Sequence, residues 1–363
     1  MNISNINNKA LLIEPYLVFF LVHSLQAGVG VLGFTRYIAE AAGFQSWIAI
    51  IISGLYFHLL IWMIYKIIGN QKKDIIAINK ETFGKFIGSF ISLMIVFYFV
   101  LAGVVVLRTY VEIIQIWIFP DISVPILCLT LSVLAYYIII QGFRVIVGVS
   151  FFSLIIPFFL LFSNFSAFEY AEFQRVLPLF NTNVEEQLLA AKTMTLSFLG
   201  PEILLLAYPF IDQAPKSQKF AHLASFYTMA LYLIIAFVHF SFYTLGHLQT
   251  IIWPTINIWK IVELPFLERF EYIGIATWLI IIIPNITLAL WASSRALKEI
   301  CNVKHIYTLR ITGVIILLIA LLFHSREAID QLNNFMSLIG QVFVTIFIPV
   351  IFIIVLLKRK MSS

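Results

Sequence analysis

Residues 26–36 read QAGVGVLGFTR and interrupt the first long apolar run of the chain. The stretch contains Gly28, Gly30 and Gly33, and each glycine costs a helix roughly 1 kcal/mol relative to alanine. A backbone that faces lipid must satisfy every N–H and C=O internally, so an irregular segment at this depth belongs inside protein or against a cavity. The stretch therefore predicts a membrane span that is broken near its middle.

A second interruption occurs at residues 199–202, which read LGPE. Pro201 removes a backbone donor, and Glu202 places a carboxyl group inside another apolar run. Two interrupted spans in corresponding positions of two halves are typical of transporter-type binding sites. Close packing between helices is the alternative explanation for the glycines, and a structural carboxyl bonded to a helix end is the alternative for Glu202.

The composition indicates an integral membrane protein that forms one membrane domain, residues 1–363. Hydrophobic residues make up 61% of the chain and charged residues only 11%, against about 25% charged in soluble domains. The net charge of +5 comes from residues in short loops, so a nucleic-acid partner is not expected. The first apolar run lacks a small-residue cleavage site and is interpreted as a retained span.

Ten apolar runs are long enough to be membrane-spanning helices, so the expected fold is all-α with ten spans. They cover residues 15–37, 46–67, 86–117, 124–140, 145–162, 188–210, 221–246, 273–297, 309–323 and 335–357. Ten spans divide into two five-helix repeats, residues 1–163 and 188–358, with the broken spans first in each. An odd number of spans per repeat makes the two repeats inverted relative to each other.

The distribution of basic residues predicts the orientation in the membrane. Lysines and arginines gather in the loops on one side, whereas the loops at residues 163–187 and 247–271 are rich in glutamate. Basic loops face the cytoplasm, so both termini are expected to be cytoplasmic and the two acidic loops to face outward.

The candidate ligand-binding residues are those at the two breaks and on the spans expected to face them. They are Ala27, Gly28, Val29 and Gly30, then Val104, then Phe198, Leu199, Gly200 and Glu202, and finally Asn285 and Thr287. Unpaired N–H groups beside a broken helix suit a ligand carboxylate. Asn285 and Thr287 follow Pro284, and a kink with locally satisfied polar groups is the equal alternative for them.

Other polar residues in the spans predict no chemistry. Arg108 and Glu112 stand one helical turn apart near the outer end of the third span, where an interfacial pair is expected. No pair of histidines has the spacing of a metal site, and no nucleophile elbow or phosphate loop occurs. We therefore expect no enzymatic activity, no metal and no cofactor.

Three stretches resemble a known family. They are GVGVLGFTRYIAEAAGFQSWIAIIISG from Gly28, FLGPEILLLAYPFI from Phe198, and LGHLQTIIWPTINIWKIVELPFLERFEYIGIATW from Leu245. They are similar to the B-subunit, permease-like family of endospore nutrient-germinant receptors, a branch of the amino acid, polyamine and organocation transporter superfamily. Phe34 and Thr35 stand where members usually have Leu-Pro.

The resemblance implies a ten-span fold of the amino-acid transporter type in the inner membrane of the spore. It implies a subunit that binds a small nutrient, an amino acid, and signals germination together with A-type and C-type receptor subunits. The alternative function is a secondary active amino-acid transporter coupled to protons or sodium. The fifth span offers Ser150 and Ser153 but no central lysine that would replace a coupling sodium ion.

Overall fold

The computed structural model describes residues 12–69, 72–263, 265 and 268–362. The predicted cytoplasmic N-terminal tail lies outside the described residues. The α-helices are α1 (Val18–Gln26), α2 (Phe34–Ala42), α3 (Trp47–Ile68), α4 (Ile75–Phe83), α5 (Lys85–Trp117), α6 (Val124–Ile140), α7 (Phe143–Ile155), α8 (Phe159–Ser163), α9 (Val184–Phe198), α10 (Leu204–Ala207), α11 (Gln218–Phe242), α12 (Leu245–Thr250), α13 (Pro254–Trp259), α14 (Phe270–Cys301), α15 (His305–Ala320), α16 (Arg326–Val342) and α17 (Ile348–Ser362).

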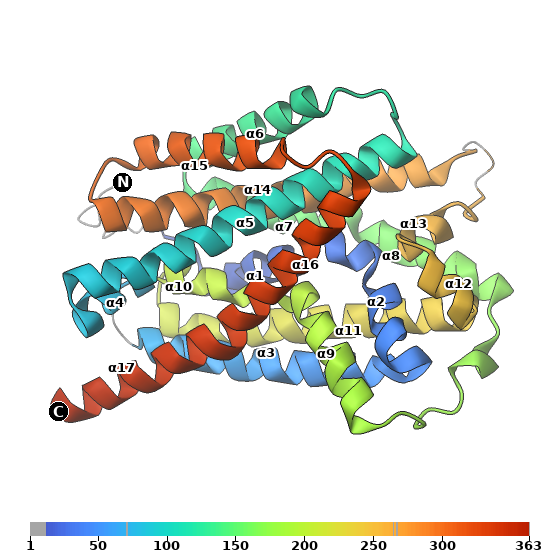
Figure 1. The fold of residues 1–363 in the computed structure, drawn as a ribbon, viewed down its shortest axis with the longest axis horizontal. Helices are drawn as coiled ribbons and strands as arrows, with labels where there is room; N and C mark the ends of the chain where they lie inside the picture. Colours follow the sequence, from blue (N-terminus) through green and yellow to red (C-terminus); the bar gives the residue numbers. More distant parts are fainter. Residues whose placement is uncertain (1–11, 70–71, 264, 266–267, 363) are drawn as a thin grey trace.

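The helices form one bundle, with α5 and α14 packed along each other (Figure 1). Six helical stretches of the described chain are long and apolar enough to cross a membrane, or seven if the bent pair Val184–Phe198 and Pro201–Phe210 is one span. Three shorter apolar helices, Pro15–Gln26, Val124–Ile140 and His305–Ala320, occupy further predicted ranges. The chain is therefore an all-helical, multi-pass membrane protein.

Both predicted interruptions coincide with departures from α-helix. α1 ends at Gln26, Gly28 is extended (φ −108°, ψ −150°), and the 3₁₀ turn η4 (Val29–Leu32) leads into α2. α9 ends at Phe198, and after a bend of 48° the chain continues through the 3₁₀ turn η9 (Pro201–Ile203) into α10. Low helix propensity at the glycines and the missing donor of Pro201 account for both positions.

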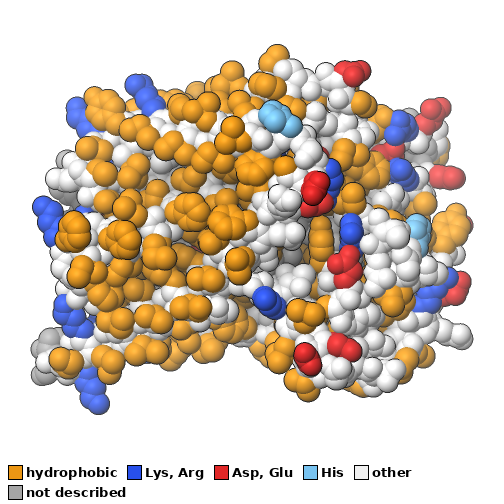
Figure 2. Space-filling model, viewed as in Figure 1, with side chains coloured by type: hydrophobic (Ala, Val, Ile, Leu, Met, Phe, Trp, Pro, Cys, Tyr) orange, Lys and Arg blue, Asp and Glu red, His pale blue; other side chains and the backbone are white. Residues whose placement is uncertain are grey.

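The two ends of the bundle differ in charge. We call the end that holds α4 and the C terminus of α17 the base, and the opposite end, with α12 and α13, the mouth (Figure 1). On the face shown in Figure 2, Lys and Arg side chains mark the base, and the Asp and Glu side chains lie toward the mouth. Apolar side chains cover the surface between them, as a lipid-facing surface requires.

Candidate functional site

A cavity of about 360 Å³ lies between the two broken segments and reaches toward the mouth. Gly28 and Gly30 form one wall, and Gly200 and Glu202 form another. Arg36, Trp253 and Asp330, from elements at the mouth, also line it. The volume falls within the usual range for small-molecule pockets.

Side chains of neighbouring helices tie the two breaks to each other. The Gln26 amide nitrogen donates to the Phe198 carbonyl at 3.0 Å. The hydroxyl of Tyr232, on α11, lies 2.7 Å from the Gln26 carbonyl and 3.0 Å from the Ser197 carbonyl. Asn285, on α14, donates to the Ser24 carbonyl at 2.8 Å. Carbonyls freed by the breaks are thus paired inside protein, which is how interrupted helices are tolerated at membrane depth.

Glu202 holds the second break in shape. Its carboxyl group accepts hydrogen bonds from the backbone N–H of Gly200, at 2.8 Å, and from the hydroxyl of Tyr98 on α5. The side chain is buried, with 2% of its surface exposed. Tyr98 in turn stacks on Phe343, with ring centroids 4.3 Å apart. Glu202 therefore connects the broken segment to α5 and, through Tyr98, to the junction of α16 and α17.

At the first break, neighbouring side chains approach the glycine backbone closely. A Cβ atom at Gly28 would lie 3.1 Å from Oδ1 of Asn285, and one at Gly30 would lie 3.1 Å from Oγ of Ser197. Among the described residues, the backbone N–H of Gly28 makes no hydrogen bond within the protein. Gly28 therefore brings a backbone donor without a protein partner to the residues that line the cavity.

The structure brings most of the candidate residues to the cavity. Gly28, Val29, Gly30, Leu199, Gly200, Glu202 and Asn285 line it. Ala27, Val104, Phe198 and Thr287 do not, although all four are buried. Ala27 faces a smaller cavity on the other side of the first break, together with His23 and Asn164. Phe198 packs against Phe57 and Tyr232 instead.

α16 contributes cavity residues that are not among the predicted ligand-binding residues. Asp330, Asn333, Asn334 and Ser337 line the cavity, and the first three of them precede the predicted tenth span, which begins at residue 335. Their spacing of three, four and seven residues places them on one helical face, and this periodicity could have identified them.

Arg108 and Glu112 have partners other than each other. The Arg108 guanidinium donates to the Phe323 carbonyl at 2.7 Å, and Glu112 pairs with Arg326 at 2.6 Å. Both contacts anchor α5 to the connection between α15 and α16. The expected Arg108–Glu112 pair is therefore replaced by tertiary contacts at the mouth.

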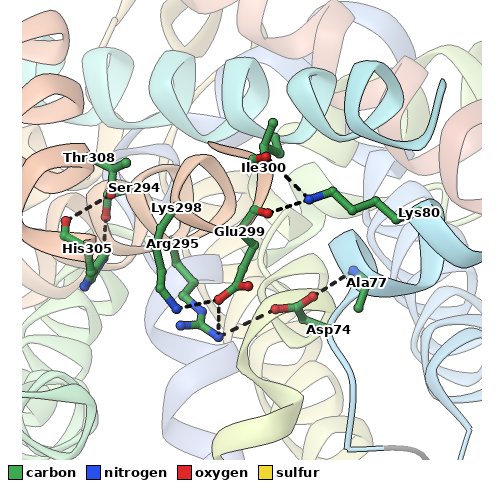
Figure 3. Close-up of polar contacts among 10 residues, drawn as sticks. All are labelled: Asp74, Ala77, Lys80, Ser294, Arg295, Lys298, Glu299, Ile300, His305 and Thr308. Atoms are coloured by element: carbon green, nitrogen blue, oxygen red, sulfur yellow. Dashed lines mark hydrogen bonds and ion pairs between the residues drawn. The ribbon is translucent and has the colours of Figure 1, made fainter. Parts of the chain in front are cut away.

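A cluster of charged residues occupies the base (Figure 3). Nη2 of Arg295, near the end of α14, lies 2.8 Å from Oε1 of Glu299 and 3.7 Å from Oδ2 of Asp74. Lys298 shares Glu299 at 2.7 Å. Asp74 also caps α4 by accepting from the N–H of Ala77 at 3.0 Å. The cluster joins α4 to α14.

Aromatic rings lie against this cluster. Phe143, Phe210 and Trp291 are in mutual ring contact, with centroids 4.6 to 5.6 Å apart. The Arg295 guanidinium lies 5.1 Å from the centroid of Phe210. Phe210 is the last residue of the second half of the bent pair, Pro201–Phe210. Its carbonyl accepts a hydrogen bond from the N–H of Ile13. The base is thus packed, in contrast to the hollow mouth.

The described residues contain no group of three or more His, Cys, Asp or Glu side chains that could hold a metal ion. Cys128 is buried and Cys301 is exposed, and both are free thiols.

Two solved structures are similar in fold. One is a manganese transporter from Eremococcus coleocola, crystallised with an aromatic bis-isothiourea compound, with a TM-score of 0.65 and 15% identity over 98% of this chain and 83% of the transporter. The other is a Na⁺-coupled sialic acid symporter in a substrate-bound outward-open state, with a TM-score of 0.63 and 12% identity over 92% of this chain and 78% of the symporter. At these identities the similarity establishes the transporter-like fold alone.

Sequence relatives identify the family. Residues 12–329 match the family model described as spore germination protein. The chain is 37% identical to spore germination protein GerQB of Bacillus cereus, over 96% of this chain and 97% of that protein. It is 24% identical to spore germination protein A2 of Bacillus subtilis, over 94% and 95% of the two chains. The chain therefore belongs to the family of spore germination proteins, the B-subunit, permease-like membrane proteins of spore germinant receptors.

Proposed function

We propose that this protein is the ligand-binding membrane subunit of a spore nutrient-germinant receptor and that its ligand is an amino acid. The observation that carries the proposal is the cavity between the two breaks. Its lining includes Gly28, whose backbone N–H has no partner among the described residues, and the apolar side chains of Val29 and Leu199. An amino acid needs donors for its carboxylate and an otherwise largely apolar pocket.

We further infer ten spans in two inverted repeats, residues 1–163 and 188–358, with both termini in the cytoplasm of the spore. The mouth then faces outward, toward an arriving nutrient. The base, with its Lys and Arg side chains, faces the core of the spore. Binding shifts the population between two arrangements of the bundle by as much as the ligand prefers one of them. A-type and C-type subunits would receive this change.

Gene deletion and ligand binding together test the proposal. Spores that lack the gene, with and without a plasmid copy, are exposed to each of the twenty common L-amino acids, and the fall in optical density is followed. The purified protein in nanodiscs is titrated calorimetrically with the same panel. We expect at least one amino acid that binds and whose germination response requires the gene. A panel without binding, or a response that survives the deletion, would overturn the proposal.

Secondary active transport of amino acids, coupled to protons or sodium, is the second candidate. Its support is the fold shared with two solved transporters. Uptake by proteoliposomes under an imposed sodium or proton gradient distinguishes the two functions. Concentrative uptake together with an unchanged germination response favours transport, and binding without uptake favours the receptor.

A further inference from the structure

The α16 wall of the cavity carries neutral hydrogen-bonding groups. Asn333, Asn334 and Ser337 lie on one helical face and line the cavity, and α16 crosses in front of α5 and α9 (Figure 1). The hydroxyl of Thr109 donates to Oδ1 of Asn333 at 3.2 Å. This hydrogen bond orients the Asn333 amide and leaves its nitrogen free to donate to a ligand. In the described chain no other side-chain hydrogen bond of Asn333 or Asn334 is found.

Ser337 lies deeper on the same face. Its oxygen accepts a long hydrogen bond, 3.4 Å, from Nε2 of Gln341, so its own proton can be donated elsewhere. Asn333 and Ser337 are each partly buried. Both present donors to the cavity, and a hydroxyl or amide oxygen is the group that would accept from them.

Two charged residues that line this cavity, Asp330 on α16 and Arg36 on α2, are already paired. Asp330 lies 2.6 Å from Arg326, and Arg36 lies 3.0 Å from Glu40. A ligand with a charged side chain would have to compete with these pairs or leave its charge without a partner. The wall therefore favours a neutral group.

The neighbouring wall, from α5, has few free polar groups. Ala102, Val105 and Val106 line it and offer no side-chain hydrogen bonds, and the polar side chains of α5 at the cavity, Tyr98 and Thr109, already bond to Glu202 and Asn333. An alkyl ligand side chain would satisfy this wall, but it would displace water from Asn333 and Ser337 without replacing the lost hydrogen bonds. A site built to hydrogen-bond a polar group rejects the alkyl analogue for this reason.

From these contacts we infer that α16 determines the specificity of the site and selects amino acids with a neutral amide or hydroxyl side chain. This inference rests on the proposed function, because it assumes that the carboxylate lies at the first break. Asparagine and leucine are a matched pair of probes, since their side chains have similar size and branching and differ in polarity.

The experiment measures both affinities by calorimetry with the purified protein in nanodiscs. We expect the wild type to bind L-asparagine about 10-fold more tightly than L-leucine, because a tenfold difference in affinity corresponds to the net free energy of about one to two hydrogen bonds. Asn333→Leu should reduce this affinity ratio to about twofold or reverse it. Ser337→Ala should lower the logarithm of the ratio by about half as much as Asn333→Leu does. Gln331→Leu is the control, because Gln331 is an exposed amide on the same helix outside the cavity.

The outcomes separate this inference from the proposed function. Three outcomes would overturn this inference alone. The wild type could bind leucine as tightly as asparagine or more tightly, or neither Asn333→Leu nor Ser337→Ala could change the ratio of the two affinities. In the third outcome, other amino acids bind but neither probe does. Failure of all twenty amino acids to bind would overturn the proposed function itself. Melting temperatures of both variants show whether a lost ratio reflects unfolding, and Ser337→Thr, which keeps the hydroxyl, should restore the preference.

Discussion

The mouth and the base of the bundle accommodate polar groups differently: the mouth leads into a cavity, whereas the base is packed and its charges are paired. Toward the mouth, Gly28 and Gly200 lie beside a cavity that Asn333, Asn334 and Ser337 also line. At the base, Arg295, Asp74 and Glu299 neutralise one another beside packed aromatic rings. A site that must exchange its occupant needs unpaired groups and space, whereas an end that must stay closed needs paired charges and dense packing.

The largest expected effect is at the base. Arg295→Met should destabilise the protein by about 3–5 kcal/mol, because it leaves the buried Asp74 carboxyl without its cation. Thermal melting of the purified protein checks this. Lys73→Met is the matched control, since the Lys73–Glu81 pair is exposed and its loss should change stability by no more than about 1 kcal/mol. Equal melting temperatures for the two variants would contradict the closed, ion-paired base.

The next effect is at the second break. Glu202→Gln should cost about 1–2 kcal/mol, because the amide oxygen can accept from the Gly200 N–H but the amide nitrogen must donate to Tyr98, whose hydroxyl then has to turn and accept. The stability loss should be accompanied by a weaker germination response. Unchanged melting and an unchanged response in the same strain would remove the role assigned to Glu202.

A smaller effect is expected at the first break. Gly30→Ala places a methyl group about 3.1 Å from Oγ of Ser197 and reduces the cavity, so ligand affinity should fall roughly 10-fold. Gly148→Ala is the control, because no atom lies within 4 Å of its added Cβ. A calorimetric titration with the activating amino acid compares them. Equal affinities would mean that the ligand binds elsewhere.

The smallest effect is a pH dependence at the base. Burial raises the pKa of the Asp74 carboxyl above its usual range, and the Ala77 N–H and Arg295 only partly oppose this. The folded state therefore binds the proton more tightly than the unfolded state, and stability falls as pH rises from the usual aspartate pKa to the raised one.

Asp74→Asn tests this sign. Arg295 keeps Glu299 as its partner and asparagine can still cap α4, so the variant should melt at least as high as the wild type at pH 7. Its advantage should shrink as pH is lowered toward 4. An advantage that grows at low pH would show that the Arg295 attraction, not burial, dominates.

Local preferences explain which features could be predicted from the sequence. The breaks at Gly28 and Gly200 follow from helix propensity, and Glu202 is conspicuous because carboxyl groups are rare in apolar runs. The side of each helix that faces the cavity does not follow from the sequence: Val104 and Thr287, two of the predicted ligand-binding residues, are buried in packed protein and do not line the cavity. Most of the polar face of α16 lies before the predicted tenth span, residues 335–357, because a search for long apolar runs leaves out a helical segment that is half polar.

From the sequence alone follow the membrane class, the helical fold, the two breaks and the family resemblance, because these depend on composition, local propensity and short motifs. Only the tertiary structure decided the partners: Glu112 with Arg326, Glu202 with Tyr98, and Asp74 with Arg295. The physical reason is that these contacts join helices far apart in the chain. Their geometry depends on how each helix is rotated and packed, which no local pattern specifies.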